Sequence, residues 1–273
     1  APDVAQEERP PASVDALLPV EIAKKAEDTG VAKAGMPALR LFVLAVLAGA
    51  FIGLGAMAAT TMWTGLSGVA PFGVARMAGG LVFALGLILV VLGGAELFTG
   101  NSLIVFAWAD GKISAAALLR NWLLVYLGNF MGATAMVAMV HITGLHNLAD
   151  GAVGATAMGI AEGKLALTPL EAFSRGILCN VLVCLAVWLC FAAHSVVSKI
   201  LAIVFPISGF VALGFEHSVA NMYMIPAGWL AGSGLVSFQG YVENLAVVTA
   251  GNIIGGGVLV AGVYWLVYHR TDN

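Results

Sequence analysis

Charged side chains are scarce in this sequence of 273 residues. Only 10% of the residues are Asp, Glu, Lys or Arg, whereas 60% are hydrophobic. A water-soluble domain carries about 25% charged residues, because its surface must be solvated. The 12 basic and 15 acidic residues therefore cannot cover a water-facing globule of this length. This composition excludes an ordinary soluble enzyme and a disordered protein, and the net charge of −3 gives no reason to expect a nucleic-acid partner.

Cysteine is rare as well. The three cysteines, Cys179, Cys184 and Cys190, lie in one apolar run and follow neither a disulfide nor a metal-ligand spacing. We therefore expect packing residues there, and no metal or cofactor. Residues 1–14 are polar and rich in proline, without the basic segment and short apolar core of a signal peptide. Membrane targeting is accordingly expected to come from the apolar spans.

Long apolar runs, by contrast, fill most of the chain. A helix needs about 20 apolar residues to cross a bilayer. Four such runs occupy residues 41–63, 117–142, 170–192 and 244–268. Two further stretches, Arg76–Asp110 and Lys199–Glu243, are too long for one crossing, and their only internal charges are Glu96 and Glu216. We interpret each as a helix that enters the membrane, breaks and continues as a half-helix, which predicts an all-α protein with six transmembrane helices, two of them broken.

The positions of Lys and Arg predict the orientation of these spans. With six spans both termini share a side, and nine of the 12 basic residues would lie there. They are Arg9, Lys24, Lys25, Lys33, Arg40, Lys112, Arg120, Lys199 and Arg270. The other side would hold Arg76, Lys164 and Arg175. Because basic residues concentrate in cytoplasmic loops, both termini are predicted to be cytoplasmic.

The segment before the first span has the pattern of an amphipathic helix. Over residues 16–34, Leu17, Leu18, Ile22 and Val31 recur at helical spacing among Lys and Glu. Such a helix is expected to lie along the cytoplasmic face. We therefore divide the chain into three parts. They are a cytoplasmic tail with this helix at 1–35, a six-span transmembrane domain at 36–269 and a short cytoplasmic tail at 270–273.

Two motifs recur in the second half of the chain. Glu96–Asn101 and Glu216–Asn221 both have Glu and Asn separated by four residues, and they lie 120 positions apart. Gly128–Gly132 and Gly251–Gly255 share Gly-Asn-x-x-Gly, 123 positions apart. Because each half would hold three spans, an odd number, the two halves must be inverted. Inverted repeats with matching broken helices are typical of transporters and channels, whose pathway lies where the breaks meet.

The polar side chains at these repeated places are expected to be structural. A charged group inside a span costs roughly 2.5–3.5 kcal/mol on insertion scales, so it needs a partner. We expect the carboxylates of Glu96 and Glu216 to accept the amide hydrogens that each break frees. Asn129 and Asn252 are expected to tie helices together beside closely packed glycines. Asn221 belongs to the same structural set.

His217 differs from the repeated residues, since Leu97 occupies the matching position in the first half. It lies in a predicted break at the midpoint of the expected pathway, and an unperturbed histidine titrates near neutral pH. We therefore predict that His217 acts in transport, with Thr99 as its hydrogen-bonding neighbour. Apolar side chains near both breaks are expected to form narrow constrictions that bare ions cross poorly. They are Phe83, Leu87, Leu97, Phe98, Phe210 and Phe215.

Several segments together resemble the formate/nitrite transporter family. The resemblance runs from about Leu17 to His269 and rests on motifs in both halves. They include Glu96-Leu-Phe-Thr99, Gly176-Ile-Leu-Cys-Asn180, Gly214-Phe-Glu-His-Ser-Val-Ala-Asn-Met222 and Gly251-Asn-Ile-Ile-Gly-Gly-Gly257. The resemblance implies an aquaporin-like protomer of six spans, assembly into a homopentamer in the lipid bilayer, and a pore in each protomer. It also implies passage of small weak-acid anions such as formate, nitrite, hydrosulfide or acetate.

The same resemblance implies roles for single residues. Leu97, Phe98 and Thr99 match the family's gating segment, and His217 matches its central histidine. Lys164 matches a basic residue that attracts anions in the outer vestibule. The remaining positions match pore constrictions or polar pore contacts, and they are Phe83, Leu87, Val183, Phe210 and Asn180.

Within that family the chain most resembles the formate branch, through segments such as Ala70-Pro-Phe-Gly73 and Asn221-Met-Tyr-Met-Ile-Pro226. Gly100-Asn101, however, resembles the nitrite and hydrosulfide branches, and the loop from Gly232 to Glu243 is shorter than in familiar formate members. We therefore expect a channel for small weak-acid anions, most favourably formate, with nitrite or hydrosulfide as the alternative. His217 is expected to share a proton with the passing anion.

Two other function classes fit these residues poorly. A neutral-solute channel of the aquaporin type would carry paired Asn-Pro-Ala motifs, which the sequence lacks. An intramembrane hydrolase would need Glu216, His217 and Ser218 to converge on a substrate, and adjacent helical residues do not face one another. We therefore predict no enzymatic activity.

Overall fold

The computed structural model describes residues 15–66 and 68–268, and the described residues contain helices and no strands. Six helices are long and apolar enough to cross a membrane. They are α2 (Ala38–Trp63), α3 (Phe72–Gly93), α5 (Ala115–Ile142), α7 (Pro169–Ala192), α8 (Val196–Leu213) and the continuous helix Phe238–Tyr268. The predicted all-α architecture with six spans is therefore confirmed.

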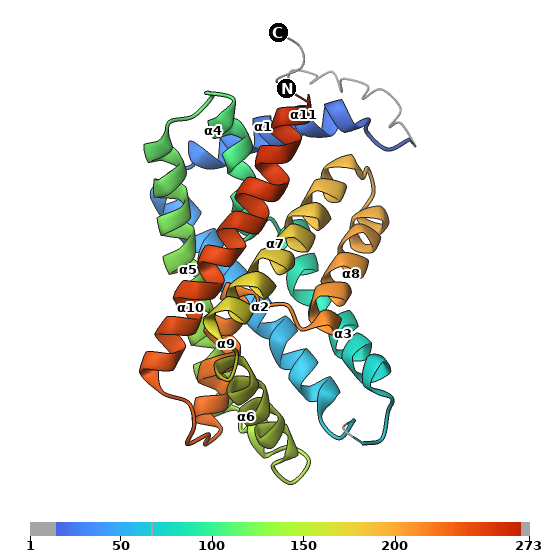
Figure 1. Cartoon of the computed structure of the whole chain (residues 1–273), viewed down its shortest axis with the longest axis vertical. Helices are drawn as coiled ribbons and strands as arrows, with labels where there is room; N and C mark the ends of the chain where they lie inside the picture. The colour runs from blue at the N-terminus through green and yellow to red at the C-terminus, as the bar shows by residue number, and fades with distance from the viewer. Residues whose placement is uncertain (1–14, 67, 269–273) are drawn as a thin grey trace, which may run out of the picture.

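Shorter elements connect and cover these spans. They are α1 (Pro19–Ala34), η1 (Gly100–Ile104), α4 (Val105–Ala109), η2 (Leu145–Asn147), α6 (Ala152–Leu165) and α9 (Ser218–Leu230). The last span is composed of α10 (Phe238–Ile253), a π-helical part η3 (Ile254–Gly262) and α11 (Val263–Tyr268). Figure 1 shows α1, α4 and α11 at one end of the bundle and α6 at the other. Six spans, an even number, bring the chain back to the side on which it started, which agrees with α1 and α11 at the same end.

Both overlong apolar stretches contain a break. Helix α3 ends at Gly94, whose φ of 76° is left-handed, and helix resumes only at η1. Helix α8 ends in the same way at Gly214, with φ 73°, and α9 begins at Ser218. Glycine adopts this conformation without the steric cost that a Cβ brings, so each stretch stops its first half-helix at a residue suited to that purpose.

The two halves of the chain repeat the same helix pairings. Helix α2 packs against α3 and α5, and α7 packs against α8 and α10. Glycines bring these pairs close together: a Cβ on Gly49 would overlap the backbone of Asn129, and a Cβ on Gly255 would overlap that of Ile177. The closely packed glycines expected beside Asn129 and Asn252 are therefore present.

Helix α1 forms where an amphipathic helix is predicted, but of the four apolar residues in the predicted pattern only Ile22 is buried. Ile22, Ala23 and Ala26 are buried, whereas Leu18 is 67% exposed and Val31 is 39% exposed. The small side chains let α1 approach η1, α4 and α7 closely. The buried face of α1 therefore packs against other helices of the same chain. Of the predicted tails, residues 1–14 and 269–273 lie outside the described residues, as do Arg9 and Arg270.

Candidate functional site

His217 lies in the second break, at the N-cap of α9, and is 2% exposed. Its Nδ1 accepts a hydrogen bond from the backbone N–H of Ala220 over 3.1 Å, and its Nε2 lies 3.0 Å from Thr99 Oγ1. Because a backbone N–H can only donate, Nδ1 carries no proton in this arrangement, and the neutral ring carries its proton on Nε2. The expected hydrogen bond between His217 and Thr99 is present, with His217 as its donor.

Asn180 binds the backbone of Thr99 by a hydrogen bond. Its Nδ2 donates to the carbonyl oxygens of Thr99 and Asn252 over 3.2 and 2.6 Å. The Cys184 thiol donates to the same Thr99 carbonyl over 3.3 Å. All three predicted packing cysteines are buried and free. Asn180 lines neither cavity described below, so it contacts the two breaks rather than open space.

Aromatic rings surround His217 on one side of the break. The rings of Phe210 and His217 are stacked at 5.9 Å between centroids, and Phe83 meets Phe210 edge-on at 5.7 Å. Phe83 and Phe210 come from α3 and α8, which pack against each other. All three side chains line one cavity, so the imidazole is presented within an apolar wall.

Two cavities approach the breaks from opposite ends and share no lining residue. The larger, which we call the α6 cavity, has a volume of about 930 Å³ and reaches His217. The smaller, the α1 cavity, has a volume of about 230 Å³ and is lined by Leu87, Leu97 and residues of α1. Leu97 and His217, which occupy matching positions, therefore face different cavities. Phe215 lines the α6 cavity.

Two of the apolar residues predicted at the pore lie away from both cavities. Phe98 is buried against α5, with its ring 6.0 Å from Trp122 and 4.9 Å from Tyr126. Val183 is 1% exposed within α7. Neither residue lines the α6 cavity or the α1 cavity. Phe98 anchors the first break to α5 in this structure.

Each break carries the same cluster of a lysine, a glutamate and two asparagines. Lys33 Nζ lies 2.8 Å from Glu96 Oε1, and Asn101 Nδ2 donates to Glu96 and to Asn121 over 2.8 and 2.9 Å. The second cluster has Lys164 Nζ 2.9 Å from Glu216 Oε1, and Asn221 Nδ2 donates to Glu216 and to Asn244 over 2.7 and 2.8 Å. The lysines come from matching helices, α1 and α6, at opposite ends of the bundle (Figure 1).

The role expected for the two glutamates is therefore wrong. Asn129 Oδ1 accepts the freed backbone N–H of Phe98 over 2.8 Å, and Asn252 Oδ1 accepts that of Ser218 over 2.9 Å. The carboxylates pair with lysines instead. A buried carboxylate without a counter-charge has a large desolvation free energy, which a hydrogen bond from one backbone N–H does not offset.

Asn129 and Asn252 also act as the helix ties that the sequence predicts. Asn129 Nδ2 donates to the carbonyl oxygens of Ala45 and Glu96 over 2.7 and 2.9 Å. Asn252 Nδ2 donates to those of Gly176 and Glu216 over 2.8 and 3.0 Å. Each asparagine thus joins the middle of a neighbouring span to its break.

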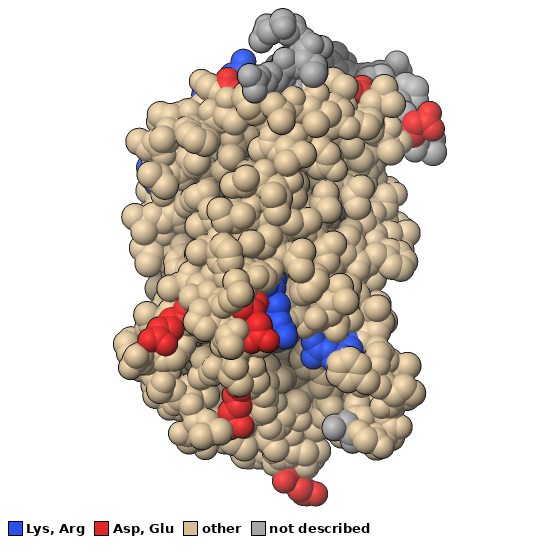
Figure 2. Space-filling view, in the orientation of Figure 1, with Lys and Arg blue, Asp and Glu red and all other residues tan. Residues whose placement is uncertain are grey.

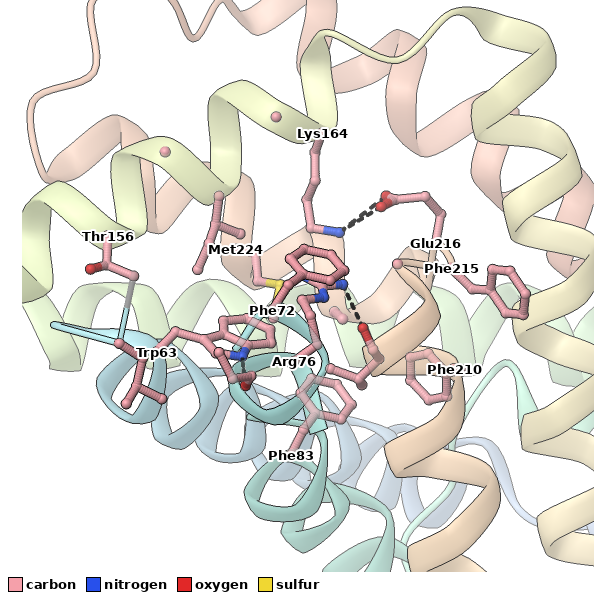
Figure 3. A pocket seen from close by; sticks show the side chains of 18 of the residues that line it. Trp63, Phe72, Arg76, Phe83, Thr156, Lys164, Phe210, Phe215, Glu216 and Met224 are labelled. Atoms are coloured by element: carbon pink, nitrogen blue, oxygen red, sulfur yellow. Dashed lines mark hydrogen bonds and ion pairs between the residues drawn. The ribbon is translucent and has the colours of Figure 1, made fainter. Parts of the chain in front are cut away.

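Cationic side chains gather in the α6 cavity. Lys164, Arg175 and Arg76 all line it, although they come from three different helices. Figure 2 shows Lys and Arg side chains collected in a hollow of an otherwise sparsely charged face. In Figure 3, Lys164 pairs with Glu216, whereas Arg76 points to backbone carbonyls of α8. Lys164 is thus neutralised by its partner, and the two arginines supply the excess positive charge.

The sequence held signals for several residues that its motifs did not single out. Asn121 and Asn244 are 123 positions apart, the same offset as Asn129 and Asn252. Lys33 and Lys164 are 131 positions apart, which differs from the offsets of 120 and 123, and only their matching ion pairs with Glu96 and Glu216 relate them.

The chain matches the family model described as "Formate/nitrite transporter" over residues 20–266. The protein belongs to the formate/nitrite transporter family. The Escherichia coli (strain K12) protein "Formate channel FocA" is 46% identical over 214 residues, which are 78% of this chain and 75% of that protein. A "Probable formate transporter" of Methanothermobacter thermautotrophicus is 39% identical over 265 residues, 92% of this chain and 96% of its own length.

Solved structures of the formate/nitrite transporter family have the same fold. A "Pentameric formate channel with formate bound" is 42% identical, with a TM-score of 0.79, and the match covers 85% of this chain and 97% of that chain. An "FNT family ion channel" is 29% identical, with a TM-score of 0.83, over 90% of this chain and 98% of that chain. The predicted family is confirmed, and the chain is a multi-pass membrane protein of a channel and transporter family.

Proposed function

We propose that this protein is a channel for small monovalent anions of weak acids, with formate as its preferred substrate. The names of the relatives described above support formate, and the solved formate channel among them is pentameric. We extend the same assembly, a homopentamer in the cytoplasmic membrane of a bacterium, to this chain. The division into a tail and helix at 1–35, a channel domain at 36–269 and a tail at 270–273 belongs to this proposal.

One observation carries the mechanism: the Nε2–H of His217 is the polar group at the apolar wall where the α6 cavity ends. A bare anion loses its hydration among Phe83, Phe210 and the leucines, which is costly unless a donor replaces the water. His217 can donate to a passing anion in place of Thr99, which it reaches over 3.0 Å. The anion is thereby stabilised at the most apolar point of the pathway.

The bond between Ala220 and His217 adds a condition on proton sharing. A neutral ring that gave up its Nε2 proton would become an anion, so proton transfer requires a second proton on Nδ1. That proton displaces the Ala220 N–H bond of 3.1 Å. We therefore propose a hydrogen-bonding role at neutral pH, when the protein acts as a channel. In acid, the imidazolium gives a proton to the anion, which crosses as the neutral acid.

Orientation is part of the proposal. The sequence predicts nine of the 12 basic residues on the cytoplasmic side, together with the predicted helix that corresponds to α1. The α1 cavity would then face the cytoplasm, and the α6 cavity would face the outside. Small anions would enter the α6 cavity during uptake and the α1 cavity during export.

Nitrite or hydrosulfide is the second candidate substrate, and Gly100 favours it. Gly100 resembles the nitrite and hydrosulfide branches, and it lines the α1 cavity next to Leu97. A side-chain hydroxyl at this position would add a hydrogen-bonding group for an oxyanion such as formate or nitrite, and glycine adds none, so this argument favours hydrosulfide more than nitrite. Acetate is expected to pass more slowly because of its methyl group.

The experiment that tests the proposal is flux into proteoliposomes, with formate, nitrite and hydrosulfide compared at pH 7 and pH 5. Formate is expected to be fastest, and its uptake should be accompanied by proton entry only at pH 5. Nitrite or hydrosulfide as the fastest anion would replace formate as the substrate. Failure of all three anions, with intact protein in the liposomes, would refute the channel proposal.

A further inference from the structure

Two arginines from different helices meet where α8 ends. Arg76 of α3 donates from Nε to the carbonyl of Ala212 over 3.1 Å and from Nη2 to that of Val211. Arg175 of α7 donates from Nη1 to the carbonyl of Gly214 over 3.4 Å. A Cβ on Gly214 would lie 3.3 Å from Arg76 Nη2 and 3.7 Å from Arg175 Nη1. The two guanidinium groups therefore flank the same point of the α6 cavity wall.

Within the described residues no carboxylate forms an ion pair with either arginine, although Glu216 attracts Arg76 and Glu171 attracts Arg175 over longer distances. Glu216, which lines the same cavity, is paired with Lys164 at 2.9 Å. Glu171 lies one turn before Arg175, but it is exposed, and its Oε2 accepts from the backbone and hydroxyl of Thr168 over 2.9 and 2.8 Å. The titratable groups lining the cavity are thus three cations, one carboxylate and His217. The two arginine charges repel each other and are only partly compensated by distant carboxylates, and a bound anion relieves that repulsion.

The arginines also keep donors free for a ligand. A guanidinium carries five N–H donors, and the protein bonds above use two of them on Arg76 and one on Arg175. The ring of Trp63 lies 5.3 Å from the guanidinium carbon of Arg76, which fixes the plane of that group (Figure 3). A fixed planar fork matches two oxygens of a carboxylate or of nitrite.

The α1 cavity offers no equivalent. Its charged lining residues are Lys33 and Glu96, which pair with each other at 2.8 Å. The arginine pair is therefore a property of one end of the pathway and not of the internal repeat.

We propose that Arg76 and Arg175 form an anion-binding site in the α6 cavity, separate from His217, for small planar oxyanions such as formate and nitrite. The inference rests on the proposed function, since the site collects the anions that the pore then passes. The site also favours formate and nitrite over hydrosulfide at the entrance. Hydrosulfide has no pair of oxygens to accept two hydrogen bonds from one guanidinium, so only the positive charges attract it.

Flux kinetics test the site through Arg175→Gln. The half-saturating formate concentration for uptake through the α6 cavity is expected to rise roughly three- to tenfold, with an unchanged maximal rate, because one nearby charge is removed. Arg175→Lys should recover part of the loss. Arg120→Gln is the matched control, since Arg120 is exposed and donates to the Met36 carbonyl at the other end. It should leave the half-saturating concentration unchanged.

Ionic strength separates this role from a purely structural one. Screening shortens the reach of a charge from about 30 Å at 0.01 M salt to about 8 Å at 0.15 M. The difference between wild type and Arg175→Gln should therefore shrink as an inert salt is added. A difference independent of salt would assign Arg175 to holding the end of α8 and overturn the proposal.

A binding measurement keeps the two proposals separable. Trp63 lines the α6 cavity, so the difference in iodide quenching between wild type and Trp63→Phe reports on it. Formate should protect Trp63 in the purified full-length protein, with a three- to tenfold weaker apparent affinity in Arg175→Gln. If formate protects Trp63 in this way but the protein does not transport formate, the channel proposal is refuted and the binding site is retained. Normal transport with equal protection in both proteins would refute the site and retain the channel.

Discussion

The two helix breaks have the same scaffold and different pathway chemistry. In both, an asparagine accepts a freed backbone N–H, and a lysine pairs with the glutamate of the break. At the matching positions that face the cavities, however, the first break has Leu97 and the second has His217. The scaffold repeats because each break must satisfy the same backbone groups. The pathway residues differ because one polar donor within an apolar wall is enough to stabilise a passing anion.

The largest effect is expected where the scaffold itself is broken. Asn252→Leu removes the partners of the Ser218 N–H and of the Gly176 and Glu216 carbonyls, all of them buried. Each unsatisfied group costs about 1–3 kcal/mol, so little folded protein should accumulate. The yield of monodisperse protein after membrane extraction measures this.

Asn129→Leu should have an equal effect, because Asn129 makes the matching bonds in the first break. The exposed Asn147 supplies a control, and Asn147→Leu should give a normal yield. Tolerance of one scaffold variant but not the other would mean that the two breaks are not equivalent in stability.

The next effect concerns the lysine–glutamate pairs. Lys164→Met leaves the Glu216 carboxylate buried and unpaired, which is expected to cost about 3–5 kcal/mol. Thermal unfolding in detergent should reveal a large decrease in Tm. Adding Glu216→Gln to Lys164→Met should recover most of the loss, and no recovery would mean that Lys164 stabilises the protein by packing instead. Lys33→Met should cost less, because the Lys33 side chain is 25% exposed against 13% for Lys164.

A third variant makes the two breaks alike. His217→Leu places in the second break the residue found in the first, and removes the Nε2–H donor. A hydrogen bond to a charged group contributes about 1.5–3 kcal/mol, so formate flux at pH 7 should fall roughly 10- to 100-fold. Proton entry with formate at pH 5 should disappear. Formate flux with unchanged pH dependence would end the proton-sharing proposal.

The smallest effect is expected at Thr99. Thr99→Val keeps the shape of the side chain but removes the acceptor of the His217 Nε2–H, which is 3.0 Å away. A neutral hydrogen bond contributes about 0.5–1.5 kcal/mol, so formate flux should change about two- to tenfold, and folding should be retained. Thr249→Val is a matched control. It removes a hydrogen bond to Tyr126, and Thr249 lines neither cavity, so this variant should leave flux unchanged. Equal effects of both variants would remove Thr99 from the pathway.

The repeat in the sequence predicted more of the scaffold than of the electrostatics. Asn129 and Asn252 were identified from their offset, and their close helix contacts are present. The partners of Glu96 and Glu216 were predicted wrongly, because Lys33 and Lys164 lie 63 and 52 positions away and belong to neither break. A pattern within one motif does not reveal a counter-charge from a distant helix.

The pore residues illustrate the same limit. His217 and Thr99 were expected to be neighbours, and they are, because each lies in a break and the breaks meet. Phe98 is next to Thr99 in sequence, yet its ring packs on Trp122 and Tyr126. In a non-helical turn adjacent side chains point in different directions, and their order along the chain does not give their contacts.

The sequence by itself determined the six spans, the two breaks, the internal repeat and the family. These follow from hydropathy and spacing along the chain, since each helix must hide its own backbone from lipid. Only the tertiary structure decided which charges neutralise one another and which remain. Arg76 and Arg175 are 99 positions apart in the sequence. They face the same cavity because α3 and α7 both pack against α8, and such packing depends on side-chain contacts between helices that no local pattern records.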